Sequence, residues 1–287
     1  MMKRALMTVS AVLLCAGLWQ IAAAGAIPWN TVPGSDQLSE RQKSVVAEVL
    51  GNYNCYAGCS DTIAQCLVEK PVGKTAKRLA AFAVRRVLAG KNAKEISDDL
   101  LRRERSAFPP KTHTITPGAG KHSGVAKAPV VVYVYADFQC PYCMIAMPAM
   151  RKLINEMPGI ITLYFKNFPV KSHKMGLPLA TALVAADNQG KYWEMMDLLY
   201  AKAPHQTEEM VTEMVKSLGM DAAKFAADRK AKATMDRIRT EKMEGIKMGM
   251  KGTPGIFING KYYAGLKTHD ELRDRIEEEL DIINGTE

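Results

Sequence analysis

Two cysteines stand three positions apart in the segment VVVYVYADFQCPYCMIAMPAM, residues 130–150. At helical spacing, residues i and i+3 bring their Cα atoms to about 5 Å, within the range that a disulfide accepts. Cys140, at or just before the first turn of a helix, would face unpaired backbone N–H groups and the positive end of the helix dipole. Both features stabilise a thiolate, which is the attacking form of cysteine. We therefore predict that Cys140 is the nucleophile and that the more buried Cys143 is the resolving thiol.

Other uses of a cysteine pair fit this spacing less well. A disulfide that closes a four-residue ring restrains the unfolded chain little, and a zinc site needs a second pair of Cys or His ligands, which does not follow. A Cys-x-x-Cys-His motif for haem attachment is also missing from the sequence. A copper site remains an alternative because Met144, Met147 and Met150 recur beside the cysteines, although that step is also ordinary core spacing in a helix. The pattern favours redox use, with no cofactor and no metal.

The residues around the pair predict a mixed α/β sheet that delivers the cysteines to the start of a helix. Residues 130–136 form a short, almost continuously apolar run, as expected of a buried central strand. Asn259–Gly260 suits the type I′ turn of a hairpin between two short strands. The remaining elements expected along the chain are a helix over 144–156, a strand over 160–168, a largely helical region over 173–250 and a last helix over 270–280.

Three segments of this back module, VYADFQCPYC, YFKNFPV and KGTPGIFINGKYYAG, resemble the DsbA-type branch of the thioredoxin superfamily. The resemblance covers nearly all of residues 128–285. It implies a thioredoxin fold with a helical insertion and a cis peptide bond at Thr253–Pro254, packed beside Cys140. It also implies that main-chain groups of Thr253 hold a substrate strand. Pro141–Tyr142 departs from the Pro-His dipeptide of the best-known DsbA.

The front of the chain, residues 35–108, is predicted to be a small all-α domain that carries three cysteines in NCYAGCSDTIAQC. Cys55 and Cys59 are close enough to bridge across one turn of irregular chain. If Ser60 caps a helix, Cys59 and Cys66 lie about 10 Å apart along it, beyond the reach of a disulfide. We therefore expect Cys55–Cys59 to pair and Cys66 to keep a free thiol. A structural staple is the alternative to a second redox pair.

Two stretches of this front module, NCYAGCSDTIAQCL and RLAAFAVRRVLAGKNAKEISDDLLRRE, are similar to the helical thiol domain of CcmH-type cytochrome c maturation proteins. The similarity extends over residues 45–105. It implies a Cys pair between the first two helices, where Cys55 and Cys59 stand. The spacing departs from that family, with three intervening residues in place of two and an additional Cys66.

The segments before and after the front module have different sequence patterns. Residues 1–26 combine a basic start, an apolar stretch and an Ala-x-Ala end, which is typical of a secretory signal; an uncut membrane anchor is the alternative. Either reading places the chain outside the cytoplasm, in the periplasm or a similar space, where disulfides persist. Residues 109–128 are rich in proline and glycine and poor in large apolar residues, which predicts a flexible linker before the DsbA-like domain at 129–287.

The formal net charge of +9 does not by itself indicate a nucleic-acid partner, because no basic stripe interleaved with aromatic residues is visible. The sequence instead predicts an exported protein thiol–disulfide oxidoreductase that acts on thiols or disulfides of proteins or peptides. Such an enzyme needs a redox partner protein, which a membrane could hold. The alternative is a non-catalytic protein that holds apocytochrome c or copper through its thiols.

Overall fold

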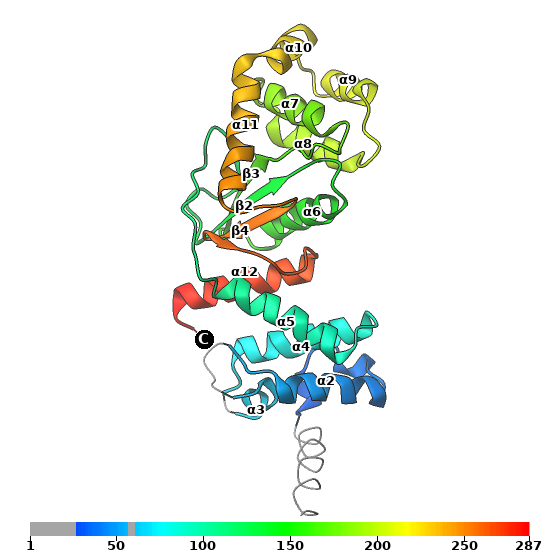
Figure 1. Cartoon of the computed structure of the whole chain (residues 1–287), viewed down its shortest axis with the longest axis vertical. Coiled ribbons are helices and arrows are strands. Elements are labelled where there is room, and N and C mark those ends of the chain that lie inside the picture. Colours follow the sequence, from blue (N-terminus) through cyan, green and yellow to red (C-terminus); the bar gives the residue numbers. More distant parts are fainter. Residues whose placement is uncertain (1–26, 57–60, 70, 287) are drawn as a thin grey trace, which may run out of the picture. The chain divides into compact units, whose positions relative to one another are not determined.

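The structure is a computed structural model that describes residues 27–56, 61–69 and 71–286 (Figure 1). The predicted signal peptide and Cys59 lie outside these residues. The described residues divide into two compact units, one within 27–104 together with 285 and 286, and the other over 105–284. Within the described ranges, no helix combines the length and the apolar character needed to cross a membrane.

The first unit is a small helical bundle. Its apolar residues recur at helical spacing, and the buried ones include Leu50, Leu79 and Leu100. Side chains define where its helices begin: Asn92 accepts from the Glu95 N–H while the Glu95 carboxylate accepts from the Asn92 N–H, each at 3.0 Å. That reciprocal cap is the capping box expected from the sequence. The elements are the 3₁₀ turns η1 (Trp29–Thr31) and η2 (Ser35–Gln37), α2 (Glu40–Asn52), α3 (Ile63–Val68), α4 (Lys74–Leu88) and α5 (Ala93–Ala107), the last of which crosses the unit boundary.

The second unit has a thioredoxin fold. Its five-stranded sheet has the order β1-β3-β2-β4-β5, in which only β2 and β3 are parallel. The strands are β1 (His122–Gly124), β2 (Val130–Ala136), β3 (Ile161–Asn167), β4 (Gly255–Ile258) and β5 (Lys261–Tyr262). The helices are α6 (Pro141–Glu156), α7 (Gly176–Asp187), α8 (Tyr192–Ala201), α9 (Glu208–Ser217), α10 (Ala222–Lys230), α11 (Lys232–Lys247) and α12 (His269–Asn284). The helical insertion expected between the second strand and the hairpin is therefore α7–α11 (Figure 1).

Strand β2 is the centre of this unit, and its two faces bury different side chains. Val130, Val132 and Val134 point into the larger core, which also contains residues of α6, α7, α8 and α12. Tyr133 and Tyr135 point to the opposite face and pack in a smaller aromatic cluster with Phe257 of β4. The strand is buried on both faces, as its continuous apolar run predicts.

The turn between β4 and β5 has the predicted type I′ geometry. Asn259 and Gly260 have φ values of 47° and 78°, and this turn type requires a positive φ at both residues. The Asn259 side chain also accepts from the Val131 N–H at 2.7 Å, which fixes the hairpin against β2.

The prediction of a flexible linker over residues 109–128 is wrong for much of that segment. Its residues 122–124 form β1, which pairs antiparallel with β3. The His113 N–H donates to the Gly260 carbonyl at 2.8 Å, and Ile115 is buried in the aromatic cluster. The physical reason is that the segment needs few apolar residues of its own, because it covers an aromatic face that β2 and β4 already provide. Backbone hydrogen bonds replace the missing apolar contacts.

Gly260 offers a test of how this segment docks on the hairpin. A Cβ at Gly260 would lie 2.3 Å from the His113 carbonyl oxygen, in addition to the cost of the positive φ. We expect Gly260→Ala to lower the free energy of unfolding by about 2–3 kcal/mol, measured by urea denaturation. Gly159→Ala is the matched control, because Gly159 has a φ of 82° but no atom within 4 Å of the added Cβ. It should cost only about 1 kcal/mol. Equal losses in the two variants would contradict the close packing of residues 111–114 against the turn.

Candidate active site

Cys140 is the N-cap residue of α6, and Pro141 is the first residue of that helix. Proline is well tolerated there because its missing N–H would have no partner within the helix. The Cys140 carbonyl accepts from the Cys143 N–H at 3.0 Å and from the Met144 N–H at 3.1 Å, which closes the first turn. Both cysteines are in the thiol form, and Cys140 is 5% exposed while Cys143 is fully buried. Cys140 therefore stands at the helix start and Cys143 is the more buried thiol, as expected from the sequence, while their roles as attacking and resolving thiols stay a prediction.

The antiparallel pairing of β2 with β4 brings the second half of the site to Cys140. Tyr135, near the end of β2, pairs with Gly255, the first residue of β4. The turn that precedes β4 therefore meets the turn that follows β2. Thr253–Pro254 in that turn is a cis peptide bond, and the Cys140 Sγ donates to the Thr253 carbonyl at 3.2 Å. The resemblance-based expectation of a cis proline beside Cys140 is confirmed, whereas the substrate-holding role of Thr253 and Pro254 stays a prediction.

The surroundings of Cys140 lower the pKa of its thiol to about 5. The largest cause is the hydrogen bond from the Cys143 thiol, which stabilises the Cys140 thiolate. Burial opposes the shift, while the Thr253 side chain and the backbone N–H groups of Cys143 and Tyr142 add to it. The N–H groups at the helix start are thus a real contribution, as predicted, but the neighbouring thiol is the larger one.

The pKa of the second cysteine shifts in the opposite direction, because burial is the largest influence on it. The pKa of the Cys143 thiol is raised far above its usual value, first by burial and then by its hydrogen bond to Cys140. One thiol of the pair is therefore ionised at neutral pH, and the other keeps its proton until the reaction needs it. This asymmetry is what a nucleophile and a resolving thiol require.

Asp137 holds the turn that presents Cys140, and sequence reasoning missed it. Its fully buried carboxylate accepts from the Gln139 N–H and the Val170 N–H, each at 2.7 Å, and His173 Nδ1 lies 2.9 Å from Oδ1. These bonds join the end of β2 to the segment between β3 and α7. An acidic residue directly after a buried strand, three positions before a reactive cysteine, was the available signal.

Two glutamine side chains attach the helical insertion to the same turn. Gln139 accepts from the Met175 N–H at 2.8 Å and donates to the Pro204 carbonyl at 3.3 Å. Gln206 donates to the Phe138 carbonyl at 3.1 Å. The insertion therefore supports the site, because its residues satisfy polar groups of the two residues that follow Asp137.

Large apolar side chains are exposed at the start of α6, which carries Cys140, and at the start of α7. Tyr142 is 66% exposed, and Ile145 and Leu177 are also exposed. Tyr142 and Ile145 lie in the first turns of α6, and Leu177 lies at the start of α7. Large apolar residues that remain in water beside a reactive sulfur are suited to contact with a protein or peptide.

The front cysteines differ in part from expectation. Cys66 is disulfide-bonded, so the prediction of a free thiol at this position is wrong. That prediction assumed a helix that starts after Ser60. In the structure α3 begins at Ile63 with Thr62 as its cap, so Cys66 lies in the first turn of the helix and little helical rise separates it from the chain before the helix. The expected disulfide between Cys55 and Cys59 is contradicted as well, because Cys55 is buried and in the thiol form. Cys59 itself lies outside the described residues. Among the described residues there is also no group of three or more His, Cys, Asp or Glu side chains that could hold a metal ion.

Comparisons with known proteins agree with this geometry. The chain matches the thioredoxin family over residues 116–278, more than half of its length, and it belongs to that family. It is 34% identical over 150 residues to the Na(+)/H(+) antiporter NhaA 1 of Salinispora arenicola (strain CNS-205), covering 50% of this chain and 22% of that protein. It is 28% identical over 170 residues to the probable disulfide bond formation protein D of Bacillus anthracis, covering 55% of this chain and 76% of that protein.

A solved structure shares the fold. The thiol-disulfide exchange protein alpha-DsbA2 from Wolbachia pipientis superposes with a TM-score of 0.50 at 20% identity, over 63% of this chain and 97% of that chain. The chain spans only about a fifth of the length of the antiporter that it matches. The thioredoxin family and the thioredoxin fold implied by the resemblance are thereby confirmed.

The low pKa of Cys140 predicts a distinctive pH profile. We expect the rate of alkylation by iodoacetamide to stay nearly constant from pH 8 to pH 6 and to fall with a midpoint near pH 5, as the thiolate is protonated. Because the folded-state pKa lies below that of an unfolded cysteine, the dithiol form gains stability between about pH 5 and pH 9 and loses it as pH falls through 5. Mass spectrometry should place the label on Cys140. Labelling of Cys143 at neutral pH would contradict the assignment.

Removal of the Asp137 carboxylate should destabilise the turn. Asp137→Ala leaves the partly buried Val170 N–H and Gln139 N–H without their acceptor, and we expect a loss of about 3 kcal/mol in urea denaturation of the dithiol form. Asp197→Ala is the control, because the exposed Asp197 carboxylate forms an ion pair with Arg151. It should cost less than about 1 kcal/mol. A similar small loss in Asp137→Ala would show that these buried bonds contribute little.

Proposed function

We propose that the chain is an exported thiol–disulfide oxidoreductase that exchanges disulfides with protein substrates through Cys140-Pro-Tyr-Cys143. The observation that carries the proposal is the Cys140 thiol at the start of α6. Its pKa is about 5, its partner thiol is buried, and the Thr253 carbonyl lies 3.2 Å from its sulfur. The names of the DsbA-type relatives and structural neighbours support the same activity.

The reaction is a pair of thiol–disulfide exchanges. The Cys140 thiolate attacks one sulfur of a substrate disulfide, a mixed disulfide forms, and the second substrate sulfur leaves as a thiolate. The departed substrate thiolate takes the Cys143 proton, and the Cys143 thiolate attacks the Cys140 sulfur. The substrate sulfur that was joined to Cys140 leaves as a thiolate that water protonates, so the substrate is released reduced and Cys140 is joined to Cys143. In the reverse direction the Cys140–Cys143 disulfide passes to a substrate dithiol, which is oxidised by two electrons.

The depressed pKa of Cys140 favours the oxidising direction. A thiolate that is stabilised in the reduced protein makes the dithiol form more stable relative to the disulfide. The disulfide is then transferred readily to substrate thiols. Continued turnover needs a redox partner protein that accepts the two electrons from the dithiol, and a membrane-bound protein would fit this role. An N-terminal signal at residues 1–26 supports operation outside the cytoplasm.

A substrate strand is proposed to lie against the turn before β4. The Thr253 main chain is adjacent to the Cys140 sulfur, and exposed Tyr142 offers apolar contact beside it. Main-chain hydrogen bonds to Thr253 would hold the substrate independently of its side chains, which suits an enzyme with many protein substrates.

Trapping experiments test the mechanism. Cys143→Ala should leave mixed disulfides on Cys140, because no resolving thiol remains, whereas Cys140→Ala should abolish turnover of a reduced peptide and of insulin. Non-reducing gels and mass spectrometry of the adducts provide the measurement. A protein that only holds its partner would saturate at one equivalent, and saturation of this kind in the unmodified chain would overturn the proposed enzyme.

A further inference from the structure

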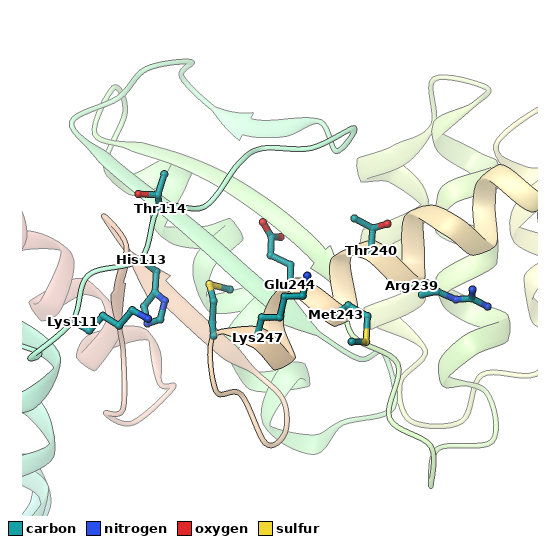
Figure 2. A pocket seen from close by; sticks show the side chains of 9 residues that line it. Lys111, His113, Thr114, Arg239, Thr240, Met243, Glu244 and Lys247 are labelled. Atoms are coloured by element: carbon teal, nitrogen blue, oxygen red, sulfur yellow. The ribbon is translucent and has the colours of Figure 1, made fainter.

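A pocket with a volume of about 470 Å³ lies between the segment 111–114 and the C-terminal half of α11 (Figure 2). This volume falls within the range of about 300–1,000 Å³ that is common for ligand sites. All of its lining residues belong to the second unit, and none of them has a role in the chemistry of Cys140. The lining consists of Lys111, His113, Thr114, Arg239, Thr240, Met243, Glu244, Lys247 and Met248.

The pocket has an excess of positive charge. Lys111, Arg239 and Lys247 are exposed, and within the described part of the chain none of the three takes part in an ion pair. Lys247 lies in the last turn of α11, where the negative end of the helix dipole offsets part of its charge. The other two cations have no such compensation.

Glu244 is the one acidic residue of the lining, and other groups of the protein already bind its carboxylate. Glu244 accepts from the Tyr135 hydroxyl at 2.6 Å, and the buried Lys166 Nζ lies 3.2 Å from the same carboxylate oxygen. Burial and the charge of Lys111 lower the pKa of His113, so its imidazole is neutral at pH 7 and can donate one hydrogen bond. The pocket therefore presents cations and neutral donors to a ligand.

The remaining lining residues indicate what else the ligand carries. Met243 is exposed and Met248 is partly buried, so two flexible thioethers offer apolar contact. Thr114 and Thr240 add hydroxyl groups. Because Arg239 and the two lysines stand exposed at the surface, the pocket cannot enclose most of a small molecule, as small-molecule sites do. It is better suited to side chains that project from a larger chain.

The chain itself connects this pocket to the active site. Five residues lead from Met248 in the pocket to Thr253, whose carbonyl lies 3.2 Å from the Cys140 sulfur. At about 3.3–3.6 Å per extended residue, the two positions are at most about 17 Å apart. A substrate strand that passes Thr253 would need about five further residues to reach the pocket.

We propose that this pocket is a subsite for an acidic segment of the protein substrate, in which carboxylates contact Lys111, Arg239 and Lys247. Arginine binds a carboxylate with two parallel hydrogen bonds, and the lysines add charge attraction. This assignment rests on the proposed oxidoreductase function for its biological meaning, because it names the kind of substrate that Cys140 meets. The binding itself does not depend on that chemistry.

The first test measures binding without any redox step. A labelled peptide that carries three glutamates beside one leucine and has no cysteine is titrated with the full chain at low salt, and its fluorescence anisotropy is recorded. We expect saturable binding that weakens about tenfold or more in the triple variant Lys111→Gln, Arg239→Gln, Lys247→Gln, because three exposed ion pairs are lost. In 1 M NaCl the difference should disappear.

A matched triple variant controls for net charge. Lys127→Gln, Lys216→Gln, Lys230→Gln removes three exposed positive charges elsewhere on the same unit and should bind the peptide within twofold of the unmodified chain. An equal loss in both variants would overturn the subsite, as would the absence of binding. Displacement of the peptide by citrate at a comparable concentration of carboxylate would assign the pocket to small anions. It would overturn the proposal that the pocket binds an acidic peptide segment.

The second test separates this inference from the proposed function. Two reduced dithiol peptides are compared as substrates, one with a Glu-Glu pair five residues from the cysteine and one with Gln-Gln at the same position. The pocket variant should lower kcat/KM about tenfold for the Glu peptide and less than twofold for the Gln peptide. Turnover of both peptides without preference would overturn the subsite alone. No turnover of either peptide, together with intact binding of the thiol-free peptide, would overturn the proposed oxidoreductase activity and would still support the subsite.

Discussion

The meeting of the Cys140 sulfur with the turn before β4 is the contact on which the site depends. It exists because β2 and β4 are antiparallel neighbours, so that the end of one strand and the start of the other lie at the same edge of the sheet. Cys140 gains the Thr253 carbonyl and side chain as neighbours, and the start of α6 supplies backbone N–H groups. The buried Cys143 thiol then stabilises the Cys140 thiolate, so one strand pairing organises both the geometry and the charge of the site.

The helical insertion has a structural purpose at this edge of the sheet. Asp137 is buried after β2 and needs several donors, which the segment between β3 and α7 provides through the Val170 N–H and His173. Gln139 and Gln206 make further bonds between the turn and the insertion. A buried carboxylate with these partners is costly to disturb, so the turn that carries Cys140 is held in one conformation. The insertion and the segment before it thereby hold the turn that presents Cys140.

Much of the second unit could be predicted from local patterns. The apolar run at 130–136 has the bounds of β2, and Asn259–Gly260 has the positive φ values that a type I′ turn needs. Residues 109–128 could not be read in this way, because their order comes from contact with Tyr133, Phe257 and the hairpin. Composition reports whether a segment can bury itself, but it does not report whether another part of the fold offers a surface that the segment can cover.

The sequence by itself determined where the Cys140–Cys143 pair stands at the start of a helix. The spacing of Cys140 and Cys143, the proline between them and the change from strand to helix pattern are local features, and local features fix a helix start. Only the tertiary structure decided how acidic Cys140 is, because the Cys143 hydrogen bond, the burial and the Thr253 side chain come from the packed site. The support by Asp137 and the basic pocket beside α11 were also decided there. Their residues are distant in the chain, and no periodicity in a sequence records which distant side chains will share one buried space.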